Sequence, residues 1–524
     1  MTTCEPAARP AATAQYHGLV RMLCRTQHIM EIELKLRLPP DALAALRADP
    51  LWAHTRATHK QLDNIYFDTP QRALAKTGIG LRLRSDGKHW LQTAKGGGGS
   101  RAGLHQREEI EFAVAGPALE WEGLAGTPFE PALEPFKDQL QPRFRTRFER
   151  EIRHVTSASG GVIEVAIDKG DIRAQDRHEP LCEVELELQS GPVDELFALA
   201  LLLVERHPLV LDNRSKAERG DRLAQGTPLS PPTKAAATAA PPDEDTRAVA
   251  RAAVEAALAH WQANEAGFLA QPQGGHYDSE YLHQLRVAVR RLRVACGPLA
   301  GAAQWRQETL APLQDSLRAL GQRLGTARDW DVFMEETWPA LAEGLHDAAL
   351  RQKLQEAVAL QQATARLQAQ AALEERGTQH LLLQLGRCLA QPDGDGEAQP
   401  FDTLTAQLDK LAHRLRQSLP RLEQLSPARL HRLRITAKKL RYLTEFIAGR
   451  YEPQATEAWL DWLKKAQTVF GLHNDRVTAR THIETLCAGM EQPGKLQHSL
   501  QAALRERAQP GLELPELPEP YWRP

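Results

Sequence analysis

The chain has few cysteines and lacks long apolar runs, and both absences limit what it can be. The six cysteines in 524 residues are widely scattered and form no CxxC pair, which disfavours a disulfide framework or a zinc site and fits a reducing compartment. No stretch comes near the roughly 18 apolar residues of a transmembrane helix, and residues 1–29 contain no apolar signal-peptide core. We therefore expect a cytoplasmic protein that does not enter the membrane.

A strong net charge is also absent. The 65 Lys and Arg and the 67 Asp and Glu residues give a formal net charge of −2, which argues against indiscriminate binding to nucleic acid or membranes. Basic residues nevertheless gather in some strips of the sequence and acidic residues in others, so the composition remains compatible with a polyanionic ligand. At this length we expect two or three domains.

Residues 30–225 show the period-two alternation of β-strands. Short runs alternate apolar and polar residues between turn signals; they are EIELKLRL, NIYFD, GLRLR, HWLQTAK, REEIEF, RFRTRFERE, VIEVAID and LCEVELELQ. Their spacing indicates antiparallel pairing, and such a set suggests a closed barrel or a sandwich. Short helices are expected at 40–49 and 193–206. Residues 1–29 are Ala-rich and aperiodic, so we expect a disordered extension or a natural start at Met30.

The pattern changes after a Pro/Ala/Thr-rich linker at 226–243. From 244 to 510 the apolar residues recur about every 3.6 residues, which predicts an all-helical domain, and 511–524 form a tail. This domain is internally repeated, because HQLRVAVRRLR (283–293) matches HRLRITAKKLR (431–441), and LGTARDWDV (324–332) matches FGLHNDRVT (470–478). The offsets of 148 and 146 residues (283 to 431, 324 to 470) predict repeats over about 244–395 and 396–510.

Charged residues alternate with aliphatic residues along the predicted strands. Alternate side chains of a strand point to the same face, so each run groups its charges: Glu31, Glu33, Lys35 and Arg37; Arg82 and Arg84; Arg107, Glu109 and Glu111; Arg145 and Arg147; Glu164 and Asp168; Glu183, Glu185 and Glu187. For a single strand, a solvated face is the simplest interpretation. Across the set, some strands supply only bases and others mainly acids, which indicates one polar interior with a basic wall and an acidic wall.

Such an interior suits a metal–polyphosphate complex. Clustered carboxylates repel one another unless a cation lies among them, and their oxygens suit hard ions such as Mg²⁺ or Mn²⁺. Clustered Arg and Lys side chains need an anion with many oxygens, which phosphate groups provide. The glycine run 96–99 is a poor phosphate loop because no Lys-Ser/Thr follows it, and we expect a flexible hairpin loop there.

The first domain resembles the CYTH superfamily, the triphosphate tunnel metalloenzymes. The run Glu31-Ile32-Glu33-Leu34-Lys35 matches the ExExK signature of that superfamily. The resemblance covers about 30–225 and includes YFDTP (66–70), GLRLR (80–84), QTAKG (92–96), RxExE (107–111), RTRFE (145–149), CEVELEL (182–188) and SKAERG (215–220). It implies an eight-stranded antiparallel β-barrel that forms a tunnel and hydrolyses a triphosphate with a divalent metal.

The same resemblance implies a role for each charged residue. The metal ligands would be Glu31, Glu33, Asp168, Glu183 and Glu185, and the phosphate-binding residues would be Lys35, Arg82, Arg84, Lys95, Arg145, Arg147 and Lys216. Arg145 stands where relatives often carry Lys, so the charge is kept. The catalytic set would be Glu31, Glu33 and Lys35, with Lys35 polarising the terminal phosphate or orienting the attacking water.

The expected reaction is hydrolysis of inorganic tripolyphosphate to diphosphate and phosphate with Mg or Mn. One alternative is an organic triphosphate substrate, as in adenylate cyclase or thiamine triphosphatase chemistry. Another is a non-catalytic polyphosphate-binding or targeting protein with a degenerate tunnel. The intact ExExK motif and the paired acids of CEVEL argue against degeneracy.

Two acid-free basic stripes mark the helical domain. His283, Arg286, Arg290 and Arg293 fall on one helix face, and His431, Arg434, Lys438 and Arg441 repeat the spacing. Like charges at i and i+4 cost about 0.2–0.5 kcal/mol per pair, so a polyanionic ligand would explain the stripes. Nucleic acid is the weaker candidate, because aromatic residues for base stacking are nearly absent from them.

This domain resembles a CHAD domain over about 244–510, which implies binding of long-chain polyphosphate and association with polyphosphate granules. The candidate residues are His283, Arg286, Arg290, Arg291, Arg293, Arg318, His431, Arg434, Lys438, Lys439, Arg441 and Lys464. Arg318 and Lys464 correspond on helices expected to precede LGTARD and FGLHND turns, and Asp329 and Asp475 are expected to cap helices or form ion pairs. The predicted fold class is multidomain α+β: an eight-stranded antiparallel β-barrel tunnel followed by an all-α, internally duplicated domain.

Overall fold

The computed structural model of the protein describes residues 27–101, 103–226, 230–236, 238, 245–271, 277–392, 401–488, 490, 493–506 and 513–523. The chain divides between Pro228 and Leu229 into two compact units. The extension predicted at 1–29 lies outside the described residues up to residue 26, and the first strand already begins at Gln27. Within these ranges, no helix combines the length and the apolar character needed to cross a bilayer.

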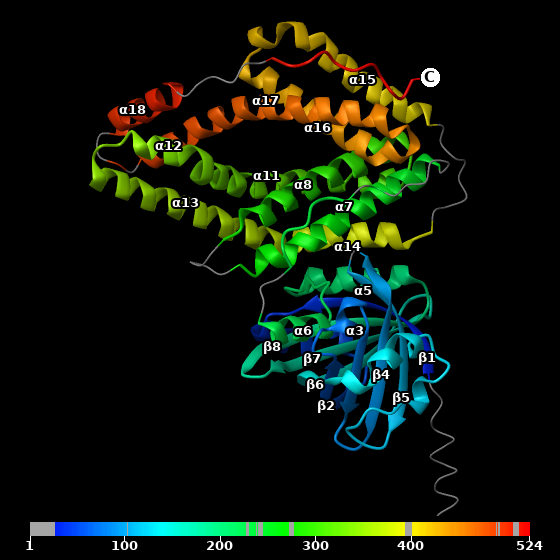
Figure 1. The fold of residues 1–524 in the computed structure, drawn as a ribbon. Coiled ribbons are helices and arrows are strands. Elements are labelled where there is room, and N and C mark those ends of the chain that lie inside the picture. Colours follow the sequence, from blue (N-terminus) through cyan, green and yellow to red (C-terminus); the bar gives the residue numbers. More distant parts are fainter. Residues whose placement is uncertain are drawn as a thin grey trace, which may run out of the picture. The chain divides into compact units, whose positions relative to one another are not determined.

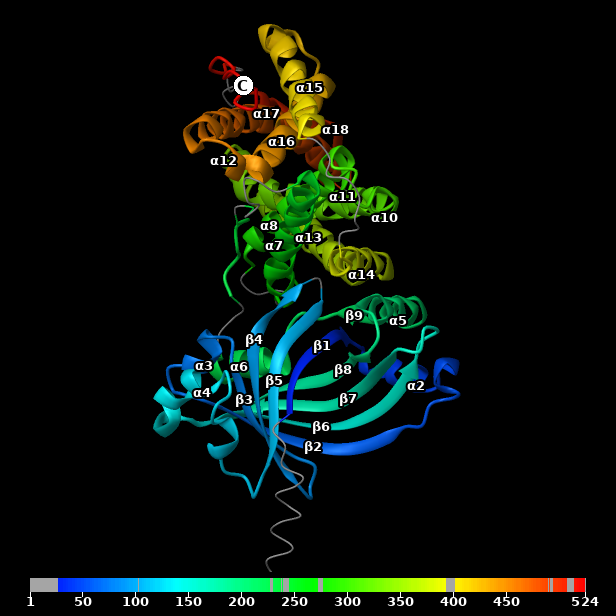
Figure 2. The ribbon, with the colours of Figure 1, turned by 90° about the vertical axis from the view of Figure 1, so that its right-hand side faces the viewer.

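The first unit is a closed antiparallel barrel, as predicted (Figures 1 and 2). Its strands lie in the order β5-β4-β3-β2-β6-β7-β8-β1, and β1 also pairs with β5, which closes the sheet. A ninth short strand, β9 (Val210–Leu211), pairs with the end of β1. The barrel strands are β1 (Gln27–Arg37), β2 (Thr58–Asp68), β3 (Gly80–Ser85), β4 (Trp90–Arg101), β5 (Leu104–Val114), β6 (Gln141–Thr156), β7 (Val162–Ala174) and β8 (Arg177–Ser190).

Alternation along the strands sends aliphatic side chains outward, where other elements cover them. Leu34 of β1 and Val184 of β8 are fully buried, and α5 (Val193–Arg206) contacts both strands. On β3, Leu83 packs with Phe129 in a second apolar cluster outside the barrel. Charged residues line much of the interior, beside a small apolar cluster of Leu62, Phe148 and Leu181. The short helices of this unit are η1 (Pro40–Ala42), α2 (Leu43–Arg47), η2 (Pro50–Trp52), α3 (Ala73–Lys76), η3 (Glu122–Leu124), α4 (Glu130–Leu133) and η4 (Glu134–Gln139).

Helix α6 (Lys216–Gln225) brings a basic side chain to the barrel interior. Ser215 caps this helix, because its Oγ accepts from the Glu218 N–H at 3.1 Å while the Glu218 carboxylate accepts from the Ser215 N–H at 2.7 Å. The helix ends at Gly226, whose φ of 63° suits a left-handed cap. The capped first turn holds Lys216 buried against the strands.

The glycine run 96–99 does not form the predicted hairpin loop. It lies inside β4, where the register with β5 shifts between Gly96 and Gly99 as in a β-bulge. A Cβ on Gly98 would lie 1.7 Å from the Gln106 carbonyl oxygen, so glycine is required for the two strands to approach.

The second unit is helical, as predicted (Figure 1). Its first repeat packs α8 on α7 and α11, the second packs α16 on α15 and α17, and α8 also contacts α16. The elements are α7 (Thr246–Leu269), α8 (Ser279–Val294), η5 (Ala295–Leu299), α9 (Ala300–Ala302), α10 (Gln307–Leu310), α11 (Leu313–Val332), η6 (Phe333–Thr337), α12 (Trp338–Glu343), α13 (Ala348–Glu374), α14 (Arg376–Ala390), α15 (Asp402–Ser418), η7 (Leu419–Gln424), α16 (Pro427–Ile447), η8 (Ala448–Arg450), α17 (Pro453–Cys487) and α18 (Pro493–Glu506).

The motifs expected as turns lie instead within continuous helices. LGTARDWDV falls inside α11 and FGLHNDRVT inside α17. In the first motif, Arg286 Nη1 donates to the Gly325 carbonyl oxygen at 3.2 Å. A Cβ at position 325 would lie 3.6 Å from Arg286 Nη2, an ordinary contact distance, so this glycine lies beside the guanidinium within the helix and does not mark a break.

Part of the predicted linker packs on the helical unit. The Thr233 N–H donates to Asn264 Oδ1 at 2.9 Å, and Asn264 Nδ2 donates to the Thr233 carbonyl oxygen at 2.9 Å. Asn264 belongs to α7 and is fully buried. Residues around 233 therefore form part of the second unit.

The predicted C-terminal tail is docked over residues 513–523. Trp459 Nε1 of α17 donates to the Glu519 carbonyl oxygen at 2.7 Å. Trp522 is buried, and its Nε1 donates to Asp409 Oδ1 of α15 at 2.9 Å. This segment thus ties α15 to α17 in the second repeat.

Candidate functional site

The register of the barrel decides which charged side chains meet in its interior. Residues opposite each other on neighbouring antiparallel strands point to the same face. Lys35 of β1 lies opposite Glu185 of β8, and Asp168 of β7 lies opposite Glu183. The interior therefore collects Glu31, Glu33, Lys35, Arg82, Arg84, Lys95, His105, Glu109, Arg150, Asp168, Glu183 and Glu185, with Lys216 added by α6.

Three buried carboxylates form one cluster. Asp168, Glu183 and Glu185 each offer an oxygen within 4.8 Å of the others. Lys216 Nζ lies 2.7 Å from Asp168 Oδ2 and 2.9 Å from Glu185 Oε1, and it also contacts Glu183. Arg150 Nη2 lies 2.7 Å from Asp168 Oδ2 and also pairs with Glu185. The acids are therefore compensated by two bases from other elements.

The acids of β1 lie beside two further ammonium groups. Lys35 Nζ is 2.8 Å from Glu33 Oε2 and contacts Glu185 as well. Lys95 Nζ contacts Glu31 and lies 3.8 Å from Glu33 Oε1. Lys35 thus links the acids of β1 to the three-carboxylate cluster.

Burial and neighbouring charges separate the two acids of β1. Burial, with Glu33 alongside, raises the pKa of Glu31 to about 8. Burial also acts to raise the pKa of Glu33, but Lys35 and Lys95 outweigh it and lower that pKa to about 2. Glu31 therefore takes up a proton far more readily than Glu33.

Two arginines of β3 face the interior with unequal partners. Arg82 Nη2 lies 3.4 Å from Glu109 Oε1. Arg84 Nε donates to the Asn64 amide oxygen at 2.9 Å, and burial followed by Arg82 lowers the pKa of Arg84 to about 10. Arg84 is thus a buried cation held by a neutral partner, which favours an anionic ligand beside it.

One neutral side chain lies among these ions. His105 of β5 is fully buried opposite Glu33, and neither ring nitrogen has a hydrogen-bond partner among the described residues. Burial, and then Lys35, lowers the pKa of this imidazole to about 4. At neutral pH the ring therefore offers one donor and one acceptor.

In the helical unit, the two basic stripes meet where α8 contacts α16. Arg290 Nε donates to the Tyr442 hydroxyl at 3.2 Å. Burial, followed by Arg290, Arg434 and Arg286, lowers the pKa of Lys438 to about 5. Four basic side chains from both repeats, Arg286, Arg290, Arg434 and Lys438, therefore form one group, which we call the repeat-junction cluster.

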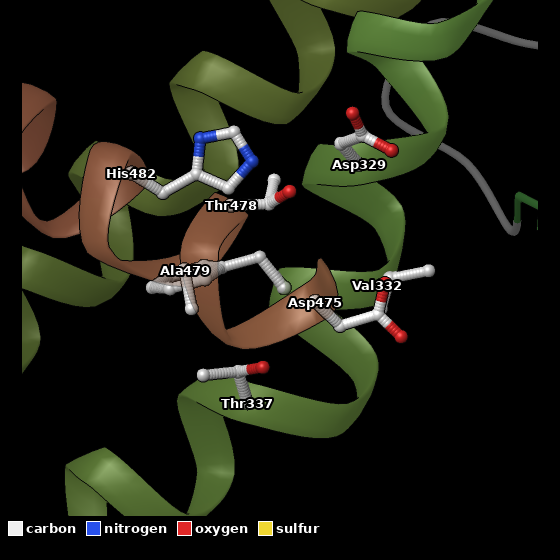
Figure 3. Close-up of a pocket in the computed structure, with 8 residues that line it drawn as sticks. Asp329, Val332, Thr337, Asp475, Thr478, Ala479 and His482 are labelled. Atoms are coloured by element: carbon white, nitrogen blue, oxygen red, sulfur yellow. The ribbon is translucent and has the colours of Figure 1, made fainter. Parts of the chain in front are cut away.

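Two aspartates accompany the repeat-junction cluster. Arg286 Nη1 is 3.2 Å from Asp329 Oδ1 of α11, and Asp475 of α17 lies near Arg434, although burial raises the Asp475 pKa. Figure 3 shows Asp329, Asp475 and His482 around one small pocket between the two helices. Two acids facing four bases leave this site with an excess of positive charge.

Known families match both units. Residues 30–220 match the family model for the CYTH domain, and residues 252–484 match the model for the CHAD domain. The chain carries a CYTH domain followed by a CHAD domain. The recognition made from the ExExK motif and from the duplicated basic stripes is therefore confirmed.

Similar proteins cover different shares of the chain. An inorganic triphosphatase of Haemophilus influenzae is 34% identical over 198 residues, which are 37% of this chain and 54% of that relative, so the chain matches about half the relative's length. An uncharacterised protein of Mycobacterium tuberculosis is 26% identical over 500 residues, 87% of this chain and 89% of that protein. The crystal structure of the CHAD domain from the plant Ricinus communis is 31% identical and covers 52% of this chain and 90% of that chain, with a TM-score of 0.44.

The CYTH barrel corrects the inward face predicted for β6. Arg145 donates to both Asp63 oxygens at 2.5 and 2.8 Å, Arg147 donates to Asp63 Oδ2 at 3.2 Å, and their side chains are 42% and 51% exposed. Both therefore lie on the outer face and not among the phosphate-binding candidates. The inward positions of β6 are those in step with Phe148, and they include Arg150, which the sequence interpretation missed.

The CYTH interior also departs from the predicted separation into two walls. Lys35 lies between Glu33 and Glu185, and Lys216 lies within the carboxylate cluster. Acids and bases are interleaved, because the register sets basic positions of one strand opposite acidic positions of the next. His105 was also missed, although its spacing of two residues from Arg107 and four from Glu109 could have placed it on the inward face.

In the CHAD domain, two of the residues predicted to bind polyphosphate have an acidic partner. Arg291 is only 2% exposed, contacts Glu445 and lies over the Phe446 ring at 4.8 Å. Arg441 Nε lies 2.8 Å from the other oxygen of Glu445. Arg291 and Arg441 therefore share the Glu445 carboxylate as a partner.

The remaining CHAD candidates lie around the repeat-junction cluster or apart from it. Burial, and the nearby Arg328 and Arg290, lower the pKa of His283 to about 4 despite Glu280. His431 Nδ1 is 2.7 Å from Asn474 Oδ1. Arg318, Lys439 and Lys464 are exposed, and Arg293 is half-buried near Arg318.

Proposed function

We propose that the CYTH domain is a metal-dependent inorganic triphosphatase that hydrolyses tripolyphosphate to diphosphate and phosphate. The proposal is carried by the interleaved interior, in which Lys35 and Lys216 each lie between carboxylates of different strands. A ligand that brings a divalent cation and many phosphate oxygens can replace both halves of these ion pairs at once. The similarity to the Haemophilus influenzae inorganic triphosphatase supports the same activity.

The donor set fits a hard divalent cation. Asp168, Glu183 and Glu185 offer only oxygen ligands, close together and buried, which suits Mg or Mn better than a thiophilic metal. Glu31 and Glu33 would add ligands from β1. When bound, the metal would neutralise phosphate charge and make a bound water more acidic.

The chain's own bases would hold the substrate and neutralise the leaving diphosphate. Arg82 and Arg84 present guanidinium groups, whose paired N–H donors match phosphate oxygens. Arg150 and Lys216 would exchange carboxylate partners for phosphate oxygens, and Lys35 would polarise the terminal phosphate or orient the attacking water. Fixed positive charge around the departing oxygens is the main source of acceleration in phosphoryl transfer.

A phosphate-release panel tests this proposal. The full chain is assayed with Mg²⁺ or Mn²⁺ on tripolyphosphate, ATP, thiamine triphosphate and long-chain polyphosphate, and again with a chelator. We expect the highest kcat/KM with tripolyphosphate and no release with the chelator. A preference for an organic triphosphate would support that alternative, and no release from any substrate would reject an enzyme.

A Glu33→Gln variant provides the internal control, because it keeps the side-chain shape and removes one charge. We expect at least a 100-fold loss of hydrolysis, since single electrostatic groups in active sites contribute about 10²–10³ in kcat. Asp171→Asn is the matched variant, because Asp171 pairs with the exposed Arg173 on the outer face. That variant should keep wild-type kinetics.

We further propose that the CHAD domain binds long-chain polyphosphate through the repeat-junction cluster. The observation that carries this proposal is the excess of bases there, where three arginines lie around Lys438 and two aspartates, Asp329 and Asp475, face them. The test compares labelled polyphosphate with single-stranded DNA of equal charge in the same salt. We expect tighter binding of polyphosphate and a steep loss of affinity with added salt, whereas equal affinity would indicate a generic polyanion binder.

A further inference from the structure

His105 is a polar residue of the barrel interior to which the proposed chemistry gives no role. The other neutral polar side chains there are satisfied, because Asn64 Nδ2 donates to Thr146 Oγ1 at 3.0 Å and Thr93 Oγ1 donates to Glu111 Oε2 at 2.9 Å. His105 is 0% exposed, and both its ring nitrogens lack a partner within the described part of the chain.

Packing alone does not explain this histidine. A buried polar group left without a hydrogen bond destabilises the folded state, so an apolar side chain of similar size would favour folding. The strand register also fixes the position of His105, which lies opposite Glu33 of β1. Glu33 and Lys35 are two residues apart on β1, so all three side chains share the inward face. A polar side chain that lowers stability at such a place is typical of a residue kept for a ligand.

We propose that His105 contacts the reacting groups of the triphosphatase. One ring nitrogen accepts a hydrogen bond from the attacking water, and the other donates its hydrogen to an oxygen of the terminal phosphate. The inference rests on the proposed triphosphatase function. In the reaction, the water oxygen bonds to the terminal phosphorus, the bridging P–O bond breaks towards diphosphate, and the released proton passes to solvent, so His105 orients the water without keeping its proton.

The two ions beside His105, Glu33 and Lys35, cannot supply this pair of hydrogen bonds. Lysine and arginine side chains only donate, and ionised carboxylates only accept. A neutral imidazole does both at once, on opposite sides of one ring. Its place beside Glu33 and Lys35 sets it next to the residues proposed to act on the terminal phosphate.

The experiment compares three variants of the full chain: His105→Leu, His105→Asn and His207→Leu. His207 is the matched control, because it is also buried, at 7% exposure, but its Nε2 is satisfied by Asp49 Oδ2 at 2.7 Å outside the barrel interior. For each variant, kcat and KM for tripolyphosphate are measured, together with Tm with and without tripolyphosphate.

We expect His105→Leu to keep or raise Tm, to lower kcat at least tenfold and to show a smaller Tm shift with tripolyphosphate. His105→Asn, which retains a donor and an acceptor, should recover part of kcat. His207→Leu should show the reverse pattern, with lower Tm and wild-type kcat.

Wild-type kcat and Tm shift in His105→Leu would overturn the inference. So would a His105→Leu chain that fails to fold while His105→Asn keeps wild-type kcat. An inactive wild-type chain would reject the triphosphatase proposal instead. In that case the Tm shifts of the wild type and of His105→Leu would still decide whether His105 contacts bound phosphate.

Discussion

The CYTH and CHAD domains place a buried and a half-buried lysine in opposite electrostatic settings. In the CYTH domain, Lys216 contacts three carboxylates, which outweigh burial and raise its pKa. In the CHAD domain, burial and three arginines lower the pKa of Lys438 to about 5. The first site is balanced before any ligand binds, whereas the second carries charge that only an anion can compensate.

This difference indicates what each domain selects. When a ligand separates the ion pairs of the CYTH interior, the carboxylates need a new cation and the bases need a new anion. The CYTH interior therefore favours a ligand that contains a cation and an anion together. The repeat-junction cluster has bases in excess and gains from a simple polyanion. If both proposals hold, one chain uses two different electrostatic arrangements to bind phosphate compounds.

The largest expected effect comes from replacing one lysine in each site and measuring the free energy of unfolding. Lys216→Met should lower the free energy of unfolding by about 3–5 kcal/mol, because it leaves the three buried carboxylates without their ammonium partner. Lys438→Met should leave the stability of the CHAD domain unchanged or higher, because burial and three arginines already disfavour the charged form of this lysine. Urea unfolding of both variants measures the two effects, and a similar loss in both would contradict the contrast.

Replacing an inward and an outward arginine of β6 should have different effects on the activity of the CYTH domain. Arg150→Met should lower kcat/KM for tripolyphosphate about 100-fold, as expected for one electrostatic group in an active site. Arg145→Met is the control, because Arg145 pairs with Asp63 outside the barrel, and it should stay within about twofold of wild type. Steady-state kinetics check both, and a larger loss in Arg145→Met would restore the face predicted from sequence.

On β6, the sequence alone does not decide which face points into the barrel. Alternation correctly predicted the strands and most inward residues, because on β1, β3 and β8 the charges occupy one parity and aliphatic residues the other. On β6 charges occupy both parities, with Arg147 and Glu149 on one and Arg150 on the other. Only the pairing of Arg147 with Asp63 of β2 decides the face, and that pairing is a tertiary fact.

A similar limit applies to the CHAD stripes. Helical spacing brought Arg286, Arg290, Arg434 and Lys438 together correctly. It also included Arg441, because the acid-free stretch ends before its ion-pair partner Glu445. Glu445 lies one helical turn after Arg441 and pairs with it. The spacing of the basic residues alone does not reveal this ion pair.

Charge reversal tests the excess charge of the CHAD site. Arg290→Glu combined with Lys438→Glu should weaken binding of labelled polyphosphate at least tenfold and reduce the salt dependence of the affinity. The matched control is Arg351→Glu with Lys353→Glu, two exposed bases on α13. Equal losses in the two double variants would mean that binding depends on overall charge and not on this cluster.

Proton uptake should distinguish the two domains as well. Lys438 faces Arg286, Arg290, Arg434 and Asp475, and its pKa near 5 leaves it mostly neutral at pH 7. Bound polyphosphate raises that pKa, so the lysine takes up a proton on binding. The affinity for polyphosphate should then be highest below pH 5 and should fall as the pH rises through the pKa that Lys438 has in the complex. The size of the fall should correspond to uptake of about one proton on binding.

Calorimetric titrations in two buffers of different ionisation enthalpy measure this uptake at pH 7. Lys438→Met should reduce it. An enthalpy independent of buffer would show that the lysine is already charged before polyphosphate binds.

The smallest effect concerns closure of the CYTH barrel. A chain starting at Gln27 keeps the backbone pairing of residues 27–29 with Glu109, Ile110 and Glu111, and a chain starting at Met30 loses it. We expect the shorter chain to lose about 1–2 kcal/mol of CYTH stability, given the few hydrogen bonds involved, with the CHAD transition unchanged. Thermal unfolding of the two chains checks this, and identical curves would show that these pairs contribute nothing.

The pairing of β1 with β8 also sets when the CYTH site can form during synthesis. Lys35 meets Glu185, 150 residues later in the chain, and Lys216 follows on α6. At about 5–20 residues per second of translation, the first strand waits roughly 10–40 s before its partners leave the ribosome. Non-local pairing of this kind also slows folding, whereas helical hairpins such as α16 and α17 close between neighbours. A nascent chain halted before α6 would hold every proposed catalytic acid and yet lack Lys216, the base that contacts all three clustered carboxylates.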